Sequence, residues 1–171
     1  MRFSKNIGFY WQRKLFMVLP VIFLLSLSLE VIAQQDPPRP IKVTKVQDLG
    51  FGTFYQGGAG GTVTILWNGT RSSGGTVVLF GIGGSSAIFN IVANPGTIIS
   101  FLKPTSSLSD GSGHFLSLQI DTTNPVSPFV ITNNYPTPTP VNFGGILTIG
   151  TPLANPPGNY TGTFDITFVQ Q

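Results

Sequence analysis

Alternating hydrophobic and polar residues mark two stretches of the chain. Between residues 160 and 169, Tyr, Gly, Phe, Ile and Phe occupy every second position, with Thr, Asp and Val between them. In residues 115–121 the same alternation places Leu116, Leu118 and Ile120 on one side. Because successive side chains of a β-strand point to opposite faces, each stretch predicts a strand with one face in the core and one in water. We expect residues 160–169 to form an integral core strand.

Shorter runs rich in β-branched and aromatic residues predict further strands. They cover residues 41–46, 62–67, 76–80, 86–93, 97–102, 129–132 and 145–149. Asn94-Pro95-Gly96 predicts a hairpin that joins 86–93 to 97–102.

The segments between these runs predict turns and loops. Residues 70–75 predict a polar loop, and Asn68-Gly69 and the glycine clusters at 57–61 and 81–84 predict turns or bulges. Alternate prolines in 135–140 predict an extended surface loop or a sheet rim. With about nine strands and no helical periodicity beyond the N-terminal segment, the fold is expected to be all-β, an immunoglobulin-like antiparallel β-sandwich.

The first 33 residues have the three parts of a secretory signal peptide. A basic stretch up to Lys14 precedes an apolar run over 15–29 and the exit Val31-Ile32-Ala33. The run contains Pro20, and it falls short of the roughly 20 apolar residues that a membrane span needs. We predict cleavage after Ala33, export to the periplasm, cell surface or extracellular space, a Pro-rich leader over 34–40 and a single β-sandwich domain over 41–171.

Removal of this signal leaves a chain of balanced charge. Of nine Lys and Arg residues four lie in 1–33, and of six acidic residues one lies there, so five of each remain. Without a basic stripe the mature chain lacks the electrostatic footprint of nucleic-acid binding and the polybasic patch of a membrane-surface protein. The chain has no Cys, so it lacks disulfides and the usual ligands of zinc.

Candidate catalytic residues are few. His114 is the only His, and small polar residues around glycines in 109–114 are typical of a hairpin loop, so a Ser-His-Asp triad with Asp110 or Asp121 is not expected. Asp110 is also the one carboxylate of a weak calcium-site hypothesis in this loop, and calcium needs several oxygen ligands. Neither glycine cluster precedes a phosphate-binding Lys-Ser/Thr pair. We therefore expect no enzymatic activity, no cofactor and no metal site.

Aromatic residues supply the candidate contacts with a ligand or partner. Tyr55, Trp67 and Tyr135 are these candidates, because an exposed ring offers a platform for sugars or proteins. Trp67 lies in a predicted strand and is expected in the core rather than at the surface, whereas Tyr135 in the Pro-rich loop is expected to be exposed.

Three short motifs resemble a known family. Residues 49–54 (LGFGTF), 60–65 (GGTVTI) and 157–164 (PGNYTGTF) resemble the bacterial family catalogued as domain of unknown function 4402 (DUF4402). That family in turn looks like the spore-coat-U-type and chaperone-usher pilus subunits, and the resemblance implies an exported immunoglobulin-like domain. The chain departs from the pilus pattern at Gln170, where an aromatic residue is usual, and in 34–40, which lacks an alternating apolar donor extension.

Together these features predict a secreted structural or adhesion module of the bacterial surface. Its expected partners are proteins of the cell surface or further copies of itself. A carbohydrate-binding module that uses exposed aromatic residues is the alternative.

Overall fold

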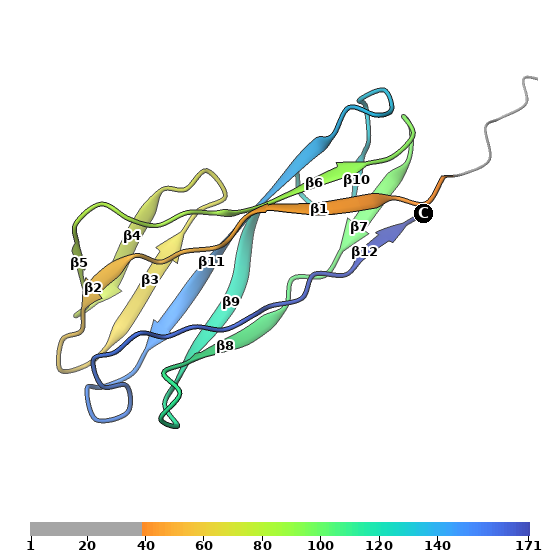
Figure 1. Ribbon diagram of the computed structural model, residues 1–171. Helices are drawn as coiled ribbons and strands as arrows, with labels where there is room; N and C mark the ends of the chain where they lie inside the picture. Colours follow the sequence, from red (N-terminus) through yellow and green to blue (C-terminus); the bar gives the residue numbers. More distant parts are fainter. Residues whose placement is uncertain (1–38) are drawn as a thin grey trace, which may run out of the picture. The chain divides into compact units, whose positions relative to one another are not determined.

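The computed structural model describes residues 39–171, which form an all-β sandwich-like fold (Figure 1). The predicted signal peptide and residues 34–38 of the predicted leader lie outside the described residues. The described chain forms twelve strands, and every ladder between them is antiparallel, so the predicted fold class is confirmed. Within residues 39–171 there is no helix of the length and apolar character that a membrane crossing requires.

Strand β11 (Thr139–Ile149) organises the larger sheet of seven strands. Its other members are β1 (Lys42–Gln47), β3 (Gly61–Ile65), β4 (Arg71–Gly75), β6 (Ala87–Val92), β8 (Thr105–Ser109) and β9 (Phe115–Asn124). One edge of β11 pairs with β9, while the other edge pairs first with β6 and then with β3. Gly144 lies where β6 gives way to β3, and a Cβ added there would lie 2.2 Å from the Ile65 carbonyl oxygen. Only glycine therefore allows this close passage of the two backbones.

Two smaller sheets cover the larger one. The first consists of β10 (Phe129–Val130), β7 (Ile98–Phe101) and β12 (Phe168–Gln170), and the second of β2 (Thr53–Tyr55) and β5 (Val78–Phe80). An aromatic cluster joins the first of them to β11, because the Phe143 ring lies 4.9 Å from that of Phe101 and 6.0 Å from that of Phe168. The predicted alternation in 115–121 is confirmed, since Leu116, Leu118 and Ile120 are all buried in this common core.

The predicted hairpin between residues 86–93 and 97–102 is wrong. Both segments are strands, β6 and β7, but they belong to different sheets. Both edges of β6 are already occupied, one by β1 and the other by β11, so neither is open to β7. The turn at 94–96 instead carries the chain from one sheet to the other, and the Gly96 amide donates to the Ile131 carbonyl at 2.8 Å.

The predicted loop at residues 70–75 is also wrong, because it contains β4. A tight turn precedes this strand, in which the Gly69 amide donates to the Leu66 carbonyl and the Leu66 amide to the Thr70 carbonyl, both at 2.9 Å. The turn aligns the polar, glycine-rich segment with β3, and five residues pair. Pairing imposed by the turn has overridden weak β propensity. The same turn ends the preceding strand at Ile65, so Trp67 lies outside it.

The C-terminal segment keeps its predicted alternation but forms only a short strand. Phe164, Ile166 and Phe168 are half-buried against the core, and the residues between them are exposed. Regular pairing is limited to β12 and to a bridge between Thr161 and Ser109. The described structure has no backbone-to-backbone hydrogen bond at residues 162–167. There the Ser106 hydroxyl, at 2.5 Å, takes the place of a backbone donor to the Thr163 carbonyl.

The Pro-rich stretch 135–140 is divided between a turn and a strand. The Thr137 amide donates to the Asn134 carbonyl at 2.8 Å, and Thr139 and Pro140 already belong to β11. Residues 135–138 are therefore at the surface as predicted, although they include a turn, and the predicted alternative of a sheet rim describes Thr139 and Pro140, which pair with β6 on one side only.

Candidate functional site

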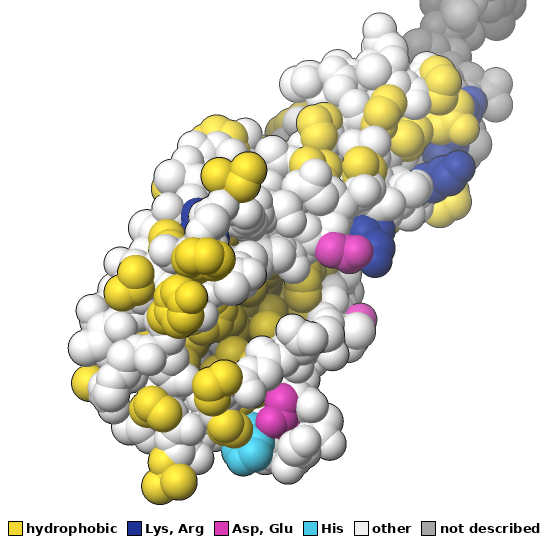
Figure 2. Space-filling model, turned by 60° about the vertical axis from the view of Figure 1, so that its left-hand side comes forward, with side chains coloured by type: hydrophobic (Ala, Val, Ile, Leu, Met, Phe, Trp, Pro, Cys, Tyr) yellow, Lys and Arg dark blue, Asp and Glu magenta, His cyan; other side chains and the backbone are white. Residues whose placement is uncertain are grey.

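A groove of about 840 Å³ opens between two extended segments of the chain. Residues 49–56, which include β2, form one wall, and residues 155–162 form much of the other. The floor is apolar and consists of Leu108, Leu116, Leu147 and Ile149. Figure 2 shows a hollow floored by hydrophobic side chains. Asp, Glu, Lys, Arg and His are all missing from the described residues that line the groove. Its surface is therefore uncharged.

Tyr55 and Phe80 form an exposed aromatic pair at the β2 wall of the groove. In the β2–β5 ribbon Phe54 and Leu79 pair and pack against the core, which turns Tyr55 and Phe80 outward. Tyr55 is 61 % and Phe80 56 % exposed, yet their rings meet edge to face with centroids 5.4 Å apart. This geometry is favourable for aromatic rings and fixes the Tyr55 side chain at the groove. Arg71 of β4 donates hydrogen bonds to the carbonyl of Thr53 in β2 and to that of Gly83, just after β5, and so links both segments to β4.

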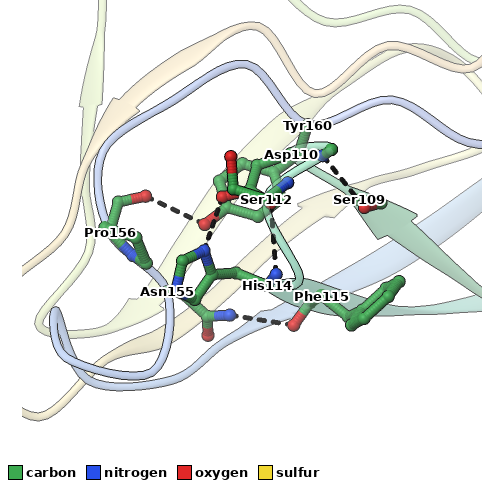
Figure 3. A network of polar contacts seen from close by, with 9 residues as sticks. Ser109, Asp110, Ser112, His114, Phe115, Asn155, Pro156 and Tyr160 are labelled. Atoms are coloured by element: carbon green, nitrogen blue, oxygen red, sulfur yellow. Dashed lines mark hydrogen bonds and ion pairs between the residues drawn. The ribbon is translucent and has the colours of Figure 1, made fainter.

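Side-chain hydrogen bonds fix the opposite wall (Figure 3). The buried Asn155 accepts from the Gly150 amide at 2.6 Å and donates to the Phe115 carbonyl at 2.8 Å. The Tyr160 hydroxyl donates to the Pro156 carbonyl at 2.9 Å. Desolvation raises the pKa of Tyr160, and the nearby Asp110 carboxylate raises it further, so the phenol stays protonated and remains a donor. These bonds hold the Tyr160 ring in place on the groove wall.

Asp110 and His114 stabilise the turn beside this wall. One Asp110 oxygen lies 2.6 Å from His114 Nδ1, and the other accepts from the amides of Ser112 at 2.7 Å and His114 at 3.1 Å. Ser109 Oγ accepts from the Gly111 amide. These contacts are those of a capped turn; within residues 39–171 none of them joins a serine hydroxyl to the His114 ring.

The Asp110 carboxylate gives the turn a pH dependence. Desolvation acts to raise its pKa, but hydrogen bonds from the Ser112 amide and from the side chain and amide of His114 outweigh it, so the pKa lies below its usual value. Such a carboxylate stabilises the fold above the unfolded-state pKa of about 3.9, and the contribution disappears as pH falls through the lower, folded-state pKa.

We therefore predict that Asp110→Asn lowers the urea midpoint at pH 6, and that the difference from the wild type shrinks as pH falls to about 2. Urea titrations across this pH range measure the unfolding midpoints of the wild type and of Asp110→Asn. Asp165→Asn, at an exposed position of the C-terminal segment, serves as the control and is expected to leave the midpoint nearly unchanged. Wild-type and Asp110→Asn curves that stay parallel down to acid pH would contradict the assignment.

The three aromatic candidates from the sequence do not form one site. Tyr55 lines the groove, whereas Trp67 lies in the β3–β4 turn and Tyr135 in the β10–β11 loop. Trp67 is 39 % exposed, so its expected place in the core is wrong. Tyr135 is exposed as expected, and the guanidinium of Arg39 lies 4.8 Å from its ring centroid. Within the described chain no ring contact joins any two of the three.

Sequence reasoning missed the two aromatic residues that complete the groove region, Phe80 and Tyr160. Phe80 becomes a neighbour of Tyr55 only through the pairing of β2 with β5, which are far apart in sequence. Tyr160 was expected on the buried face of a strand; it is partly buried against the core but lies outside any strand. Its local sequence carries no signal that places its ring in a groove.

Metal ligands do not cluster in the described part of the chain. No group of three His, Cys, Asp or Glu side chains within residues 39–171 is arranged to hold an ion.

The fold and the groove define a class of protein: an antiparallel β-sandwich with an uncharged groove beside an exposed aromatic pair. A family model described as Domain of unknown function (DUF4402) matches residues 41–169, so the chain belongs to this family, as the motif resemblance predicted. Comparisons with curated proteins and with solved structures found no match. The resemblance to spore-coat-U-type and chaperone-usher subunits stays a prediction.

Proposed function

We propose that this protein is an exported adhesion module of the bacterial surface, and that its contact site is the groove together with the Tyr55–Phe80 pair. The observation that carries the proposal is this exposed aromatic pair at the edge of an uncharged groove. Single exposed hydrophobic residues are ordinary, but contiguous apolar surface beside a cleft marks interaction sites. Val78, which pairs with Tyr55 across the ribbon, extends the apolar surface and is also exposed.

The two walls of this site are fixed before any partner binds. The edge-to-face contact orders Tyr55, and the Asn155 and Tyr160 hydrogen bonds order the other side. A preorganised site loses less side-chain entropy on binding, which favours affinity. The export part of the proposal rests on the sequence pattern of residues 1–33 and not on the fold.

The test uses bacteria that produce the full chain. Antibody labelling of intact cells measures surface exposure, and attachment is measured to cells of the same strain, to immobilised polysaccharide and to protein-coated wells. A Tyr55→Ala/Phe80→Ala double variant is expected to lower attachment several-fold at an unchanged amount of surface protein. Val130→Ala, which removes an exposed apolar side chain from β10, is the matched control and is expected to attach like the wild type.

Two results would overturn the proposal. One is a protein that antibodies do not reach on intact cells. The other is attachment that the double variant leaves unchanged.

A further inference from the structure

We infer that the groove binds a neutral oligosaccharide. This inference rests on the proposed function, because it names the ligand class of the same site. The residues that line the groove are uncharged. A sulfated, phosphorylated or uronic-acid polymer would call for Lys or Arg side chains to pair with its anions, and the described lining supplies neither. A volume of about 840 Å³ is also within the range of small-molecule sites.

Two tyrosines line the groove. Tyr55 lines the groove from the β2 wall and Tyr160 from the opposite wall. The flat C–H face of a sugar ring is apolar and packs on an aromatic ring, while its hydroxyls remain at the edge. The Tyr160 hydroxyl is already bound to Pro156, so this residue offers its ring to a ligand and not its donor. A chain of sugar rings that lies across the groove would contact one tyrosine on each wall.

Three polar side chains of the groove lining have no hydrogen-bond partner within the described structure. Thr53, Asn159 and Thr161 line the groove with exposed side chains, and none of the three side chains is hydrogen-bonded to another residue of the described structure. Two hydroxyls and an amide are uncharged groups that both donate and accept, as sugar hydroxyls do. They lie on both walls, around an apolar floor, which matches the polar rim and apolar face of a pyranose.

The experiment measures binding of the purified full chain by isothermal titration calorimetry. The neutral probes are maltohexaose, cellohexaose, xylohexaose, mannohexaose and chitohexaose, and the charged probes are a hexagalacturonate and a heparin hexasaccharide. We expect binding of at least one neutral probe and of neither charged one. Tyr55→Ala is expected to weaken that binding by about tenfold or more, whereas Tyr55→Phe, which keeps the ring, stays close to the wild type. Tyr135→Ala, at an exposed tyrosine outside the groove, is the control and is expected to bind normally.

The inference is overturned if none of the neutral probes binds, if the charged probes bind instead, or if folded Tyr55→Ala binds as well as the wild type. Circular dichroism spectra of the variants establish that they are folded. Failure of this inference can be told apart from failure of the proposed function. Attachment that depends on Tyr55 and Phe80, but is not inhibited by any of the saccharides, would leave the adhesion module standing with a different ligand.

Discussion

Replacement of Phe143 by alanine is expected to destabilise the domain by about 3 to 5 kcal/mol, through lost transfer free energy and the cavity left behind. The Phe143 side chain is fully buried and lies against Phe89, Phe101 and Phe168, so it joins three strands of two sheets. Small domains have a total stability of about 5 to 15 kcal/mol, so a single change of this size removes a large share of it. The measurement is the free energy of unfolding from urea titration.

Phe115→Ala is the matched control for this prediction. Phe115 is in β9, a direct neighbour of β11, but its side chain is 59 % exposed. Loss of an exposed ring is expected to change stability by no more than about 0.5 kcal/mol. Equal effects of the two changes would show that the aromatic cluster is not the centre of the core.

The strands that could be predicted from the sequence are those whose own residues show which strand face is buried and which is exposed. In β9 the Leu116, Leu118 and Ile120 alternation arises because one strand face touches the core and the other touches water, and this can be read without knowing the neighbours. Turn residues such as Asn68-Gly69 were equally readable, because glycine tolerates the positive φ of 82° that this turn requires.

Strands whose formation depends on distant partners were missed. The strands β2 and β8 were not predicted. The residues of β2 favour strands, but there are only three of them, and the Ser-rich β8 carries little β signal; both form because β5 and β9 offer them edges. The β6–β7 hairpin failed for the converse reason, since a local turn signal cannot show that other strands already occupy both edges of β6. Pairing partners are a property of the whole fold, and the local sequence limits them only weakly.

The candidate groove was beyond prediction for the same reason. Of its aromatic residues only Tyr55 was named from the sequence, as one of three candidates on separate elements. The groove exists because residues 49–56 and 155–162 lie opposite each other, about a hundred positions apart in the chain. That distance leaves no periodicity or spacing to detect.

Deletion of residues 160–171 is expected to unfold the domain, although only three residues of this segment form a strand. The reason is side-chain packing. Phe168 lies 5.8 Å from Phe101 and 5.9 Å from Phe89 in the aromatic cluster, and Phe164 and Ile166 cover the same core. Each large apolar side chain contributes about 1.5 to 3 kcal/mol when fully buried. Three half-buried side chains therefore contribute about 2 to 4.5 kcal/mol, which comes close to the lower end of the net stability of a small domain, about 5 to 15 kcal/mol, before the loss of the β12 pairing is added.

The measurements are the far-ultraviolet circular dichroism spectrum and size-exclusion chromatography of the truncated chain. We expect the strand spectrum and the cooperative melting transition to be lost. The milder variant Phe168→Ala is expected to remain folded and to lose about 1.5 to 2.5 kcal/mol, half the cost for a fully buried Phe, and Thr167→Ala, at the exposed position beside it, about 0.5 kcal/mol or less. A truncated chain that is soluble, folded and unfolds cooperatively would show that residues 160–171 pack on a core that is stable without them. Loss of folding in the truncation would show that this segment is part of the fold, and the contrast between Phe168 and Thr167 would show that side-chain burial contributes to its effect beyond the backbone pairing of β12, which both single variants keep.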